Sequence, residues 1–184
     1  MEPIVTKRLL LRQFVIGDFE SLRDIQSRPE VTRFLYWGPR DDDEVRKGLK
    51  LRQSRTSLDG LDSVIEYAVV ARESGLLIGD VQIALVSAEY RTGELGFVFH
   101  PAHHGLGYAR EATTELLRVG FDELGLHRII GRCDARNTAS AGLMGRLGMR
   151  REAHFRRNEF VKGEWCDELV YAMLAEEWAN RQTR

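Results

Sequence analysis

The hydrophobic pattern changes its period between residues 64 and 124, and this change constrains the fold more than any other feature. Apolar residues alternate with other residues at about 64–71, 77–86 and 92–99, and Gly75 marks the first turn. A period of two is typical of strands, so we expect three consecutive strands in an antiparallel meander. From Gly105 to Leu124 the apolar residues instead recur at helical spacing, and Gly125 follows where a helix C′ residue is expected. A meander followed by a helix indicates a mixed α/β (α+β) domain.

The segments on either side add elements of the same two kinds. Apolar runs predict further strands at about 4–14, 128–133, 151–161 and 165–174. Helical spacing and capping residues predict further helices at about 17–28, 41–55 and 137–147. Pro29 begins a short turn in which we expect Val31, Phe34 and Leu35 to be buried. Since no repeat or linker interrupts this order, we expect residues 1–184 to form a single domain.

Charge and cysteine content exclude several classes of protein. The 184 residues contain 27 Lys and Arg against 28 Asp and Glu, a net charge of −1, so a nucleic-acid partner is not expected. Only the local basic patch of Arg150, Arg151, Arg156 and Arg157 could attract an anionic partner such as RNA, and a solvated surface is its alternative interpretation. Cys133 and Cys166 are too few for a disulfide framework and too far apart for a CxxC pair, which suits a reducing compartment. The first residues are polar, and no run of 18 apolar residues occurs. We therefore expect a cytoplasmic protein with no membrane segment.

The segment 97–112 carries the clearest chemical signal, because a predicted strand is followed by a short loop, two glycines and a helix. Gly105 and Gly107 allow a tight turn, and the first N–H groups of the helix point at one spot, which suits a phosphate. A P-loop would need Lys and Ser or Thr after the last glycine, but Tyr108 and Ala109 stand there. A dinucleotide fingerprint would need a small residue at Arg110. A purely structural role for the two glycines remains an alternative.

Further motifs resemble one family. In the GNAT superfamily of N-acetyltransferases, a strand, a [Q/R]xxGxG loop and an AsnxxSer or AsnxxAla helix start follow in this order. The corresponding segments here are 94–99, 102–107 and Asn137-Thr138-Ala139-Ser140. Residues 94–149 therefore resemble the family's acetyl-CoA-binding core. The N-terminal Thr6-Lys7-Arg8-Leu9-Leu10-Leu11-Arg12 is similar to the RimJ/RimL branch, which acetylates the N-termini of ribosomal proteins.

The resemblance implies a mixed, mostly antiparallel sheet with helices on both faces and two splayed central strands. It implies acetyl-CoA as the acetyl donor, with the backbone of Phe97, Val98 and Phe99 pairing the pantetheine arm and the N–H of Val98 facing the thioester oxygen. The pyrophosphate would be wrapped by main-chain groups of His103, His104, Gly105, Leu106, Gly107, Tyr108 and Ala109. Asn137 would hydrogen-bond the pantetheine, although helix capping alone would also explain an Asn there.

Two positions depart from the family pattern. Ala102 replaces the Gln or Arg of the loop, and Met144 stands where many relatives have a Tyr that protonates the leaving thiolate. Ser140 becomes the candidate acid, with water as the alternative. Glu94 resembles the carboxylate that some relatives use as a base, or it is a salt-bridged strand residue.

We therefore expect an enzyme that transfers acetyl directly to a primary amine, most plausibly a protein or peptide N-terminal α-amine. A small amine such as a polyamine, aminoglycoside or amino acid is the alternative acceptor, and a non-catalytic acyl-CoA-binding sensor is the alternative class. Tyr36 and Trp37 would shape the acceptor pocket or else pack in the core. We expect no covalent relay, because Cys133 falls in a buried strand, no metal at His100, His103 and His104, and a homodimer as in the family.

Overall fold

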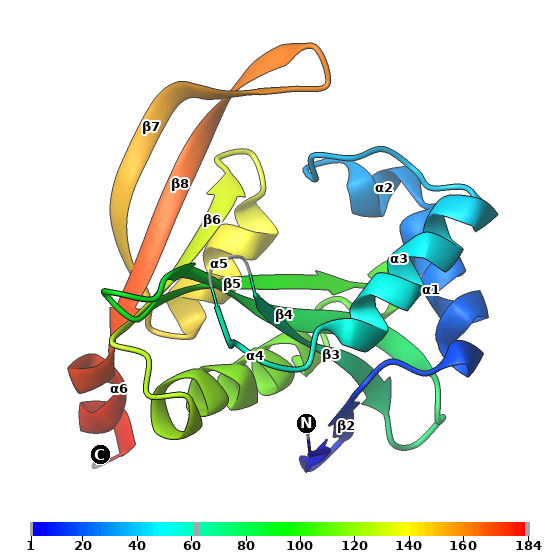
Figure 1. The fold of residues 1–184 in the computed structure, drawn as a ribbon. Helices are drawn as coiled ribbons and strands as arrows, with labels where there is room; N and C mark the ends of the chain where they lie inside the picture. Colours follow the sequence, from blue (N-terminus) through cyan, green and yellow to red (C-terminus); the bar gives the residue numbers. More distant parts are fainter. Residues whose placement is uncertain (1, 61–62, 183–184) are drawn as a thin grey trace.

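An eight-stranded sheet forms the centre of the computed structural model, which describes residues 2–60 and 63–182 (Figure 1). Its strands, in spatial order, are β1 (Ile4–Val5), β2 (Leu9–Arg12), β3 (Val64–Ala71), β4 (Leu77–Ser87), β5 (Thr92–Phe99), β6 (Arg128–Asp134), β8 (Glu164–Leu174) and β7 (Arg150–Val161). Every neighbouring pair is antiparallel except β5 and β6, which are parallel. The predicted mixed, mostly antiparallel sheet is confirmed.

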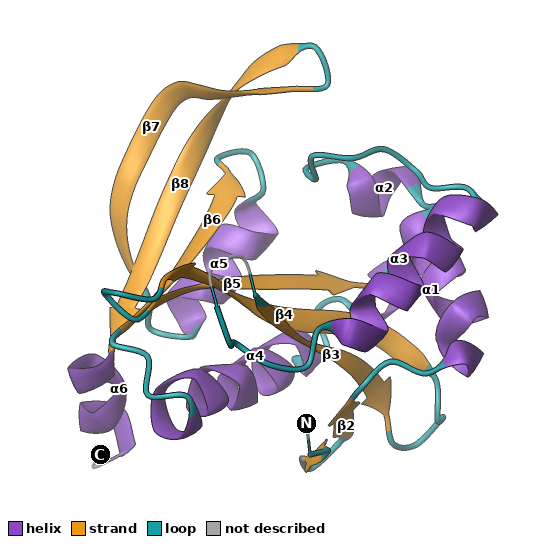
Figure 2. Ribbon diagram, in the orientation of Figure 1, coloured by secondary structure: helices purple, strands orange, loops and turns teal. Residues whose placement is uncertain are grey.

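Helices cover both faces of this sheet (Figure 2). They are α1 (Phe19–Gln26), α2 (Pro29–Thr32), α3 (Asp42–Ser54), α4 (Tyr108–Arg118), α5 (Thr138–Arg146) and α6 (Ala175–Gln182). On one face α4 and α5 bury residues such as Leu116 and Met144 in the larger hydrophobic cluster. On the other face α1 and α3 bury Leu22 and Leu49 against a smaller cluster. Burial of these apolar faces is the main force that fixes the layers.

The structure corrects several expected boundaries. The opening segment forms two short strands that pair with each other, and α4 begins at Tyr108 rather than at Gly105. The helix α6, which the sequence analysis missed, buries Trp178 in a stacked contact with Phe121. The expected burial of Val31, Phe34 and Leu35 is wrong, since all three are half-buried. Phe34 and Leu35 lie on the wall of a cavity, which explains their partial exposure.

The parallel strands β5 and β6 separate soon after they meet. Thr92, Gly93 and Glu94 pair with residues 128–130 of β6, and no later residue of β5 pairs with β6 in the described chain. From Gly131 to Asp134, β6 instead pairs with β8 alone. The expected splay of the two central strands is therefore confirmed, and it leaves a V-shaped opening in the middle of the sheet.

Within residues 2–60 and 63–182, no helix is both long and apolar enough to cross a bilayer.

Candidate active site

The opening between β5 and β6 leads into a cavity of about 650 Å³. Its wall combines the splayed strands with the start of α5, the loop before α3, and α3 itself. Among the lining residues are Tyr36, Trp37, Arg40, Arg52, Arg55, Asp80, Glu94, Gly96, Phe97, Val98, Arg132, Cys133, Asn137 and Ser140. The structure thus brings Glu94, Ser140 and Asn137 together with Tyr36 and Trp37, although these residues come from distant parts of the sequence.

The direction of the β5 backbone groups follows from its pairing with β4. The N–H of His100 donates to the carbonyl oxygen of Ile78 at 2.9 Å, and Val98 pairs with Asp80 in the same register. Because backbone groups alternate along a strand, the N–H of Val98 also faces β4, whereas the N–H and C=O of Phe97 face the opening. The expected orientation of the Val98 N–H toward a thioester is therefore wrong. Phe97 is the better candidate for an oxyanion donor.

The glycine loop has the geometry of an anion site. Gly105 and Gly107 adopt φ values of +75° and +82°, in the left-handed region that favours glycine. Gly107 is the N-cap of α4 and offers no side-chain acceptor, so the first N–H groups of the helix are left for another acceptor. Residues 104–107 are exposed. An exposed helix start with free donors fits a phosphate or pyrophosphate.

Arg8 also contributes to this loop, and the sequence analysis did not assign it a role. Its Nη1 donates to the carbonyl oxygen of Leu106 at 2.8 Å, and its guanidinium lies 4.5 Å from the centre of the Tyr108 ring. A Cβ on Gly107 would lie 3.3 Å from its Nη2. Arg8 thus places a guanidinium beside a loop in which Ala102 stands where the family has Gln or Arg. In the sequence, Arg8 lies within the Thr6–Arg12 motif, but that motif was interpreted only as a sign of the RimJ/RimL branch.

The start of α5 has mixed roles. The Asn137 side chain accepts the N–H of Ser140 at 3.1 Å, so the capping role exists and any contact to pantetheine stays a prediction. Ser140 is half-buried on the cavity wall. Met144 is buried, and its sulfur occupies the space that a side chain at Gly131 would fill. Position 144 therefore belongs to the core and offers no proton donor to the cavity.

Glu94 lies on the cavity wall beside a second carboxylate. Its Oε2 is 3.4 Å from Nε of Arg132, whose Nη1 is 3.8 Å from Oε1 of Glu168. Burial raises the pKa of Glu94; Arg132 opposes this shift and Glu168 adds to it. Glu94 is thus both ion-paired and part of the cavity wall. A raised pKa is suited to a carboxylate that acts as a base near neutral pH.

Tyr36 and Trp37 lie on the opposite wall. Tyr36 is 70% exposed, which excludes core packing for this ring. Partial desolvation, and then the charges of Glu159, Glu168 and Glu94, raise the pKa of Tyr36, so its hydroxyl faces these acidic residues although most of the ring is exposed. Trp37 packs against Arg40, whose guanidinium carbon is 4.0 Å from the ring centre.

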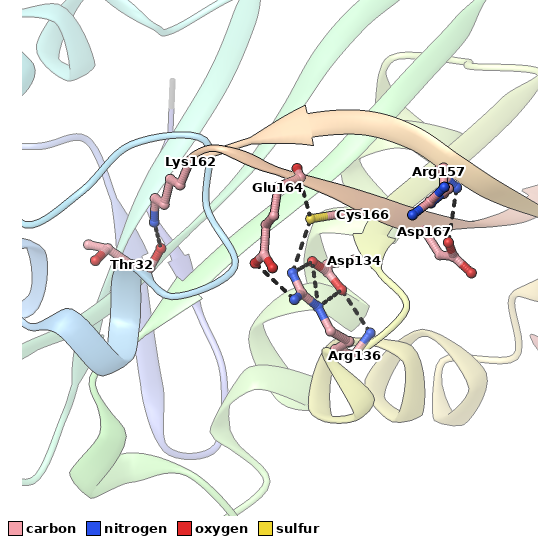
Figure 3. A network of polar contacts seen from close by, with 8 residues as sticks. All are labelled: Thr32, Asp134, Arg136, Arg157, Lys162, Glu164, Cys166 and Asp167. Carbon is pink, nitrogen blue, oxygen red and sulfur yellow. Dashed lines mark hydrogen bonds and ion pairs between the residues drawn. The ribbon is translucent and has the colours of Figure 1, made fainter.

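The tip of the β7–β8 hairpin lies against α2 (Figure 3). Lys162 donates from Nζ to the carbonyl oxygen of Thr32 at 2.6 Å, which joins the hairpin turn to α2. Arg136 pairs with Asp134 and Glu164 at 2.6 and 2.9 Å. These contacts frame a second cavity of about 140 Å³, which shares Glu94, Tyr36 and Arg132 with the first.

Cys133 requires a correction, because it lines both cavities instead of being enclosed in the sheet. Burial, followed by the charges of Asp134 and Glu168, raises the pKa of its thiol to about 11. At neutral pH only about one thiol in 10⁴ would then be ionised, which disfavours a nucleophilic role.

Metal ligands are not grouped in the described residues 2–60 and 63–182, where no three His, Cys, Asp or Glu side chains could hold an ion together. His100 instead contacts Asp24 at 2.9 Å, and His104 contacts the carbonyl oxygen of Phe99 at 3.0 Å.

Comparison with known proteins identifies the family of this chain. The sequence profile of the Acetyltransferase (GNAT) domain matches residues 8–150. The Uncharacterized N-acetyltransferase YnaD of Bacillus subtilis (strain 168) is 34% identical over 175 residues, which cover 95% of this chain and 98% of that protein. A crystal structure of an acetyltransferase (GNAT family) from Bacillus anthracis is 32% identical, with a TM-score of 0.86 over 96% of this chain and 100% of that one. The chain therefore belongs to the GNAT acetyltransferase family.

A more distant structure shows the same fold. Spermidine N-acetyltransferase from Vibrio cholerae, in complex with CoA and spermine, superimposes with a TM-score of 0.80 over 95% of this chain and 100% of that one. Its sequence identity is 20%, so this similarity concerns the fold alone. The chain is thus a GNAT-type acetyltransferase, and members of this family use acetyl-CoA and act on amine acceptors.

Proposed function

We propose that this protein transfers the acetyl group of acetyl-CoA directly to a primary amine, and that the amine is the N-terminal α-amine of a protein or peptide. The observation that carries this proposal is the cavity at the splayed strands. The part of β5 that has separated from β6 lies between the loop at Gly105 and Gly107, which we assign to phosphate binding, and the carboxylate of Glu94 on the cavity wall. Acetyl-CoA supplies the thioester carbon that the amine attacks.

The chain offers binding groups for the pyrophosphate, the pantetheine arm and the thioester of acetyl-CoA. The loop at Gly105 and Gly107 receives the pyrophosphate, and Arg8 adds a charge beside it. The pantetheine arm lies along β5 as an added strand, because the backbone groups of Phe97 have no partner strand there. The Phe97 N–H stabilises the negative charge that develops on the thioester oxygen.

The free-energy cost of deprotonating the acceptor supports an α-amine. Neutralising an α-amine with a pKa near 8 costs about 1.4 kcal/mol at pH 7, whereas a lysine with a pKa near 10.4 costs about 4.6 kcal/mol. A partly buried Glu94 with a raised pKa is suited to removing the proton of an α-amine, which has the lower of these two costs. Ser140, on the same wall, is the proposed donor to the departing thiolate. Transfer is direct, since the Cys133 thiol is a poor nucleophile.

Two further observations bear on the acceptor. The [Ribosomal protein uS5]-alanine N-acetyltransferase of Escherichia coli (strain K12) is 26% identical over 94 residues, which cover 51% of this chain and 48% of that protein. Together with the Thr6–Arg12 motif, this supports a place in the RimJ/RimL-like branch. The second cavity has six acidic residues and four basic residues on its wall, and this excess of negative charge favours a small cationic amine as the second candidate.

The test is release of CoA by purified protein with acetyl-CoA and a panel of acceptors. The panel contains N-terminal peptides, lysine peptides, polyamines, aminoglycosides and free amino acids. We expect turnover to be highest with N-terminal peptides. Turnover confined to polyamines would replace the proposed acceptor with the second candidate. Calorimetric binding of acetyl-CoA without turnover on any amine would contradict the proposed enzyme and favour an acyl-CoA sensor.

A further inference from the structure

The end of the large cavity beneath α3 holds a cluster of arginines. Arg40, Arg52 and Arg55 line this end, together with the carboxylates of Glu66 and Asp80. Glu94 lines the same cavity at the opening of the sheet. An acceptor whose amine lies at Glu94 therefore has the arginine cluster within the same enclosure.

Two of the three arginines share one carboxylate. Arg52 Nε lies 2.8 Å from one oxygen of Glu66, and Arg55 Nη1 lies 2.6 Å from the other. Glu66 is 1% exposed, so this pairing is shielded from water. The contact to Arg55 is a hydrogen bond, whereas the contact to Arg52 is an ion pair without hydrogen-bond geometry. A single carboxylate offsets one of these two guanidinium charges, and it leaves no charge for the third arginine.

Arg40 has no carboxylate within 4.0 Å among the described residues. Its Nη1 donates to the neutral amide oxygen of Gln26 at 3.2 Å, and its guanidinium stacks on Trp37. On α3, Gly48 leaves room for it, since a Cβ there would lie 3.1 Å from Nη1 of Arg40 and 3.2 Å from Nη1 of Arg52. Arg40 is thus held in one orientation by neutral groups, with a second guanidinium beside it.

Electrostatics around Arg40 favour the arrival of an anion. Burial, followed by the positive charge of Arg52, lowers the pKa of Arg40 from its ordinary value, although Glu44 opposes the shift. Asp80 also lies on the wall, but its Oδ2 has no hydrogen-bond partner. Burial raises the pKa of Asp80 to about 7, so its carboxyl is partly protonated at neutral pH and offsets the arginines incompletely.

We propose that Arg40 binds a carboxylate of the acceptor while the reactive amine lies at Glu94. This inference rests on the proposed acetyl transfer and names the acceptor class more closely: a molecule that carries a primary amine and, at another position of the same cavity, a carboxylate. A stacked, fixed guanidinium is well suited to two parallel hydrogen bonds with a carboxylate. The carboxylate comes either from an acidic residue beside a peptide N-terminus or from a free amino acid.

Matched acceptor pairs test this inference and separate its two sources. One pair is a peptide that begins Ser-Glu and the same peptide with Ser-Gln; the other is free glutamate and free glutamine. We expect the wild type to prefer the carboxylate member of one pair, and Arg40→Gln to reduce that kcat/KM ratio about ten-fold or more. Arg46→Gln is the matched control, because Arg46 is an exposed α3 residue that stacks on Phe19 outside the cavity. An unchanged ratio in Arg40→Gln would overturn the inference.

A binding measurement keeps the inference testable if no acceptor is turned over, which would contradict the proposed function alone. Trp37 lies against Arg40, so its fluorescence reports an anion at this position. We expect titration with succinate to give a saturable fluorescence change in the wild type and in Arg46→Gln, but not in Arg40→Gln. The same change in Arg40→Gln, or none in the wild type, would show that Arg40 does not bind carboxylates.

Discussion

Arg8 and Glu111 connect the N-terminal segment to the first turn of α4. The Nε of Arg8 lies 2.7 Å from Oε2 of Glu111, and the backbone N–H of Arg8 donates to Oε1 at 2.9 Å. The Thr6 hydroxyl donates to the same Oε1 at 2.6 Å. Burial opposes ionisation of Glu111, but these hydrogen bonds lower its pKa overall. Arg8, more than 100 positions before Glu111 in the sequence, thus connects the N-terminal segment to the start of α4 and, through Leu106, to the glycine loop.

Substitution of Arg8 should weaken acetyl-CoA binding. Arg8→Gln removes the ion pair with Glu111 and the positive charge beside the loop, and it leaves the Glu111 carboxylate near the phosphates. We expect the dissociation constant of acetyl-CoA to rise about five- to twenty-fold, measured by calorimetry. Arg72→Gln is the control, because Arg72 donates to the carbonyl oxygens of Thr6 and Lys7 in the same segment. Equal affinities for the two variants would argue against a role of Arg8 at the loop.

The conformation of Gly107 makes a second prediction. At φ +82° a side chain is strained, and a Cβ would also approach Arg8. Gly107→Ala should reduce the free energy of unfolding by about 1–2 kcal/mol in urea titrations, and Gly107→Glu should abolish acetyl-CoA binding by filling the anion site with negative charge. Gly145→Ala, in α5 with open space around it, should do neither. Retained affinity in Gly107→Glu would remove the loop from the proposed site.

Most of the fold could be predicted because its signals are local. The alternation at 64–99 gives β3, β4 and β5, and the turn at Lys162 and Gly163 has positive φ at both positions, as a tight hairpin requires. The helix α6 could not be predicted with the same ease. Its stability depends on Trp178 packing on Phe121, a contact between segments that are distant in sequence.

The local geometry of the candidate site was predictable where glycines and capping residues define it, as at Gly107 and Asn137. It was not predictable where strand register decides the outcome. A shift of one residue reverses the direction of every backbone group, so the sequence alone could not distinguish Phe97 from Val98. The role of Arg8 depends on a tertiary contact with Leu106, which no periodicity shows.

Ser140 provides a test of the proposed proton donor. Its half-buried side chain lies on the cavity wall, and its backbone N–H, not its hydroxyl, serves the Asn137 cap. Ser140→Ala should therefore fold normally and bind acetyl-CoA with little change, while kcat falls about ten-fold or more. Rapid-mix and steady-state measurements of CoA release would check this. An unchanged kcat would indicate that water protonates the thiolate.

Glu94 should govern the pH dependence of the reaction. A carboxylate acts as a base only above its pKa, and burial raises the pKa of Glu94 toward working pH. Glu94→Gln should lower kcat/KM most below about pH 8, where an α-amine is still protonated, and less above it. Exposed Glu89→Gln is the control. Parallel pH profiles for Glu94→Gln and the wild type would assign the proton path to water.

Asp80 makes a prediction about stability and its sign. The ordinary pKa of this carboxyl is 3.8, and burial raises it to about 7 in the folded protein, against the opposing effect of Arg52. Between these values the folded state holds a proton that the unfolded state has released. The contribution of Asp80 to the free energy of unfolding therefore falls as the pH rises through this interval, by at most about 1.4 kcal/mol per pH unit.

The Asp80→Asn variant has no carboxyl group at this position, so its free energy of unfolding lacks this decrease with rising pH. Relative to the wild type, the variant should gain stability between pH 4 and pH 8, measured by urea unfolding at several pH values. The Asp59→Asn variant, changed at an exposed position, should show the same pH dependence of the free energy of unfolding as the wild type. If the wild type instead gained stability over Asp80→Asn as the pH rose, the Asp80 carboxylate would be stabilised by Arg52 and Arg55 more than burial destabilises it. The arginine cluster beneath α3 would then be less positive than an anion site at Arg40 requires.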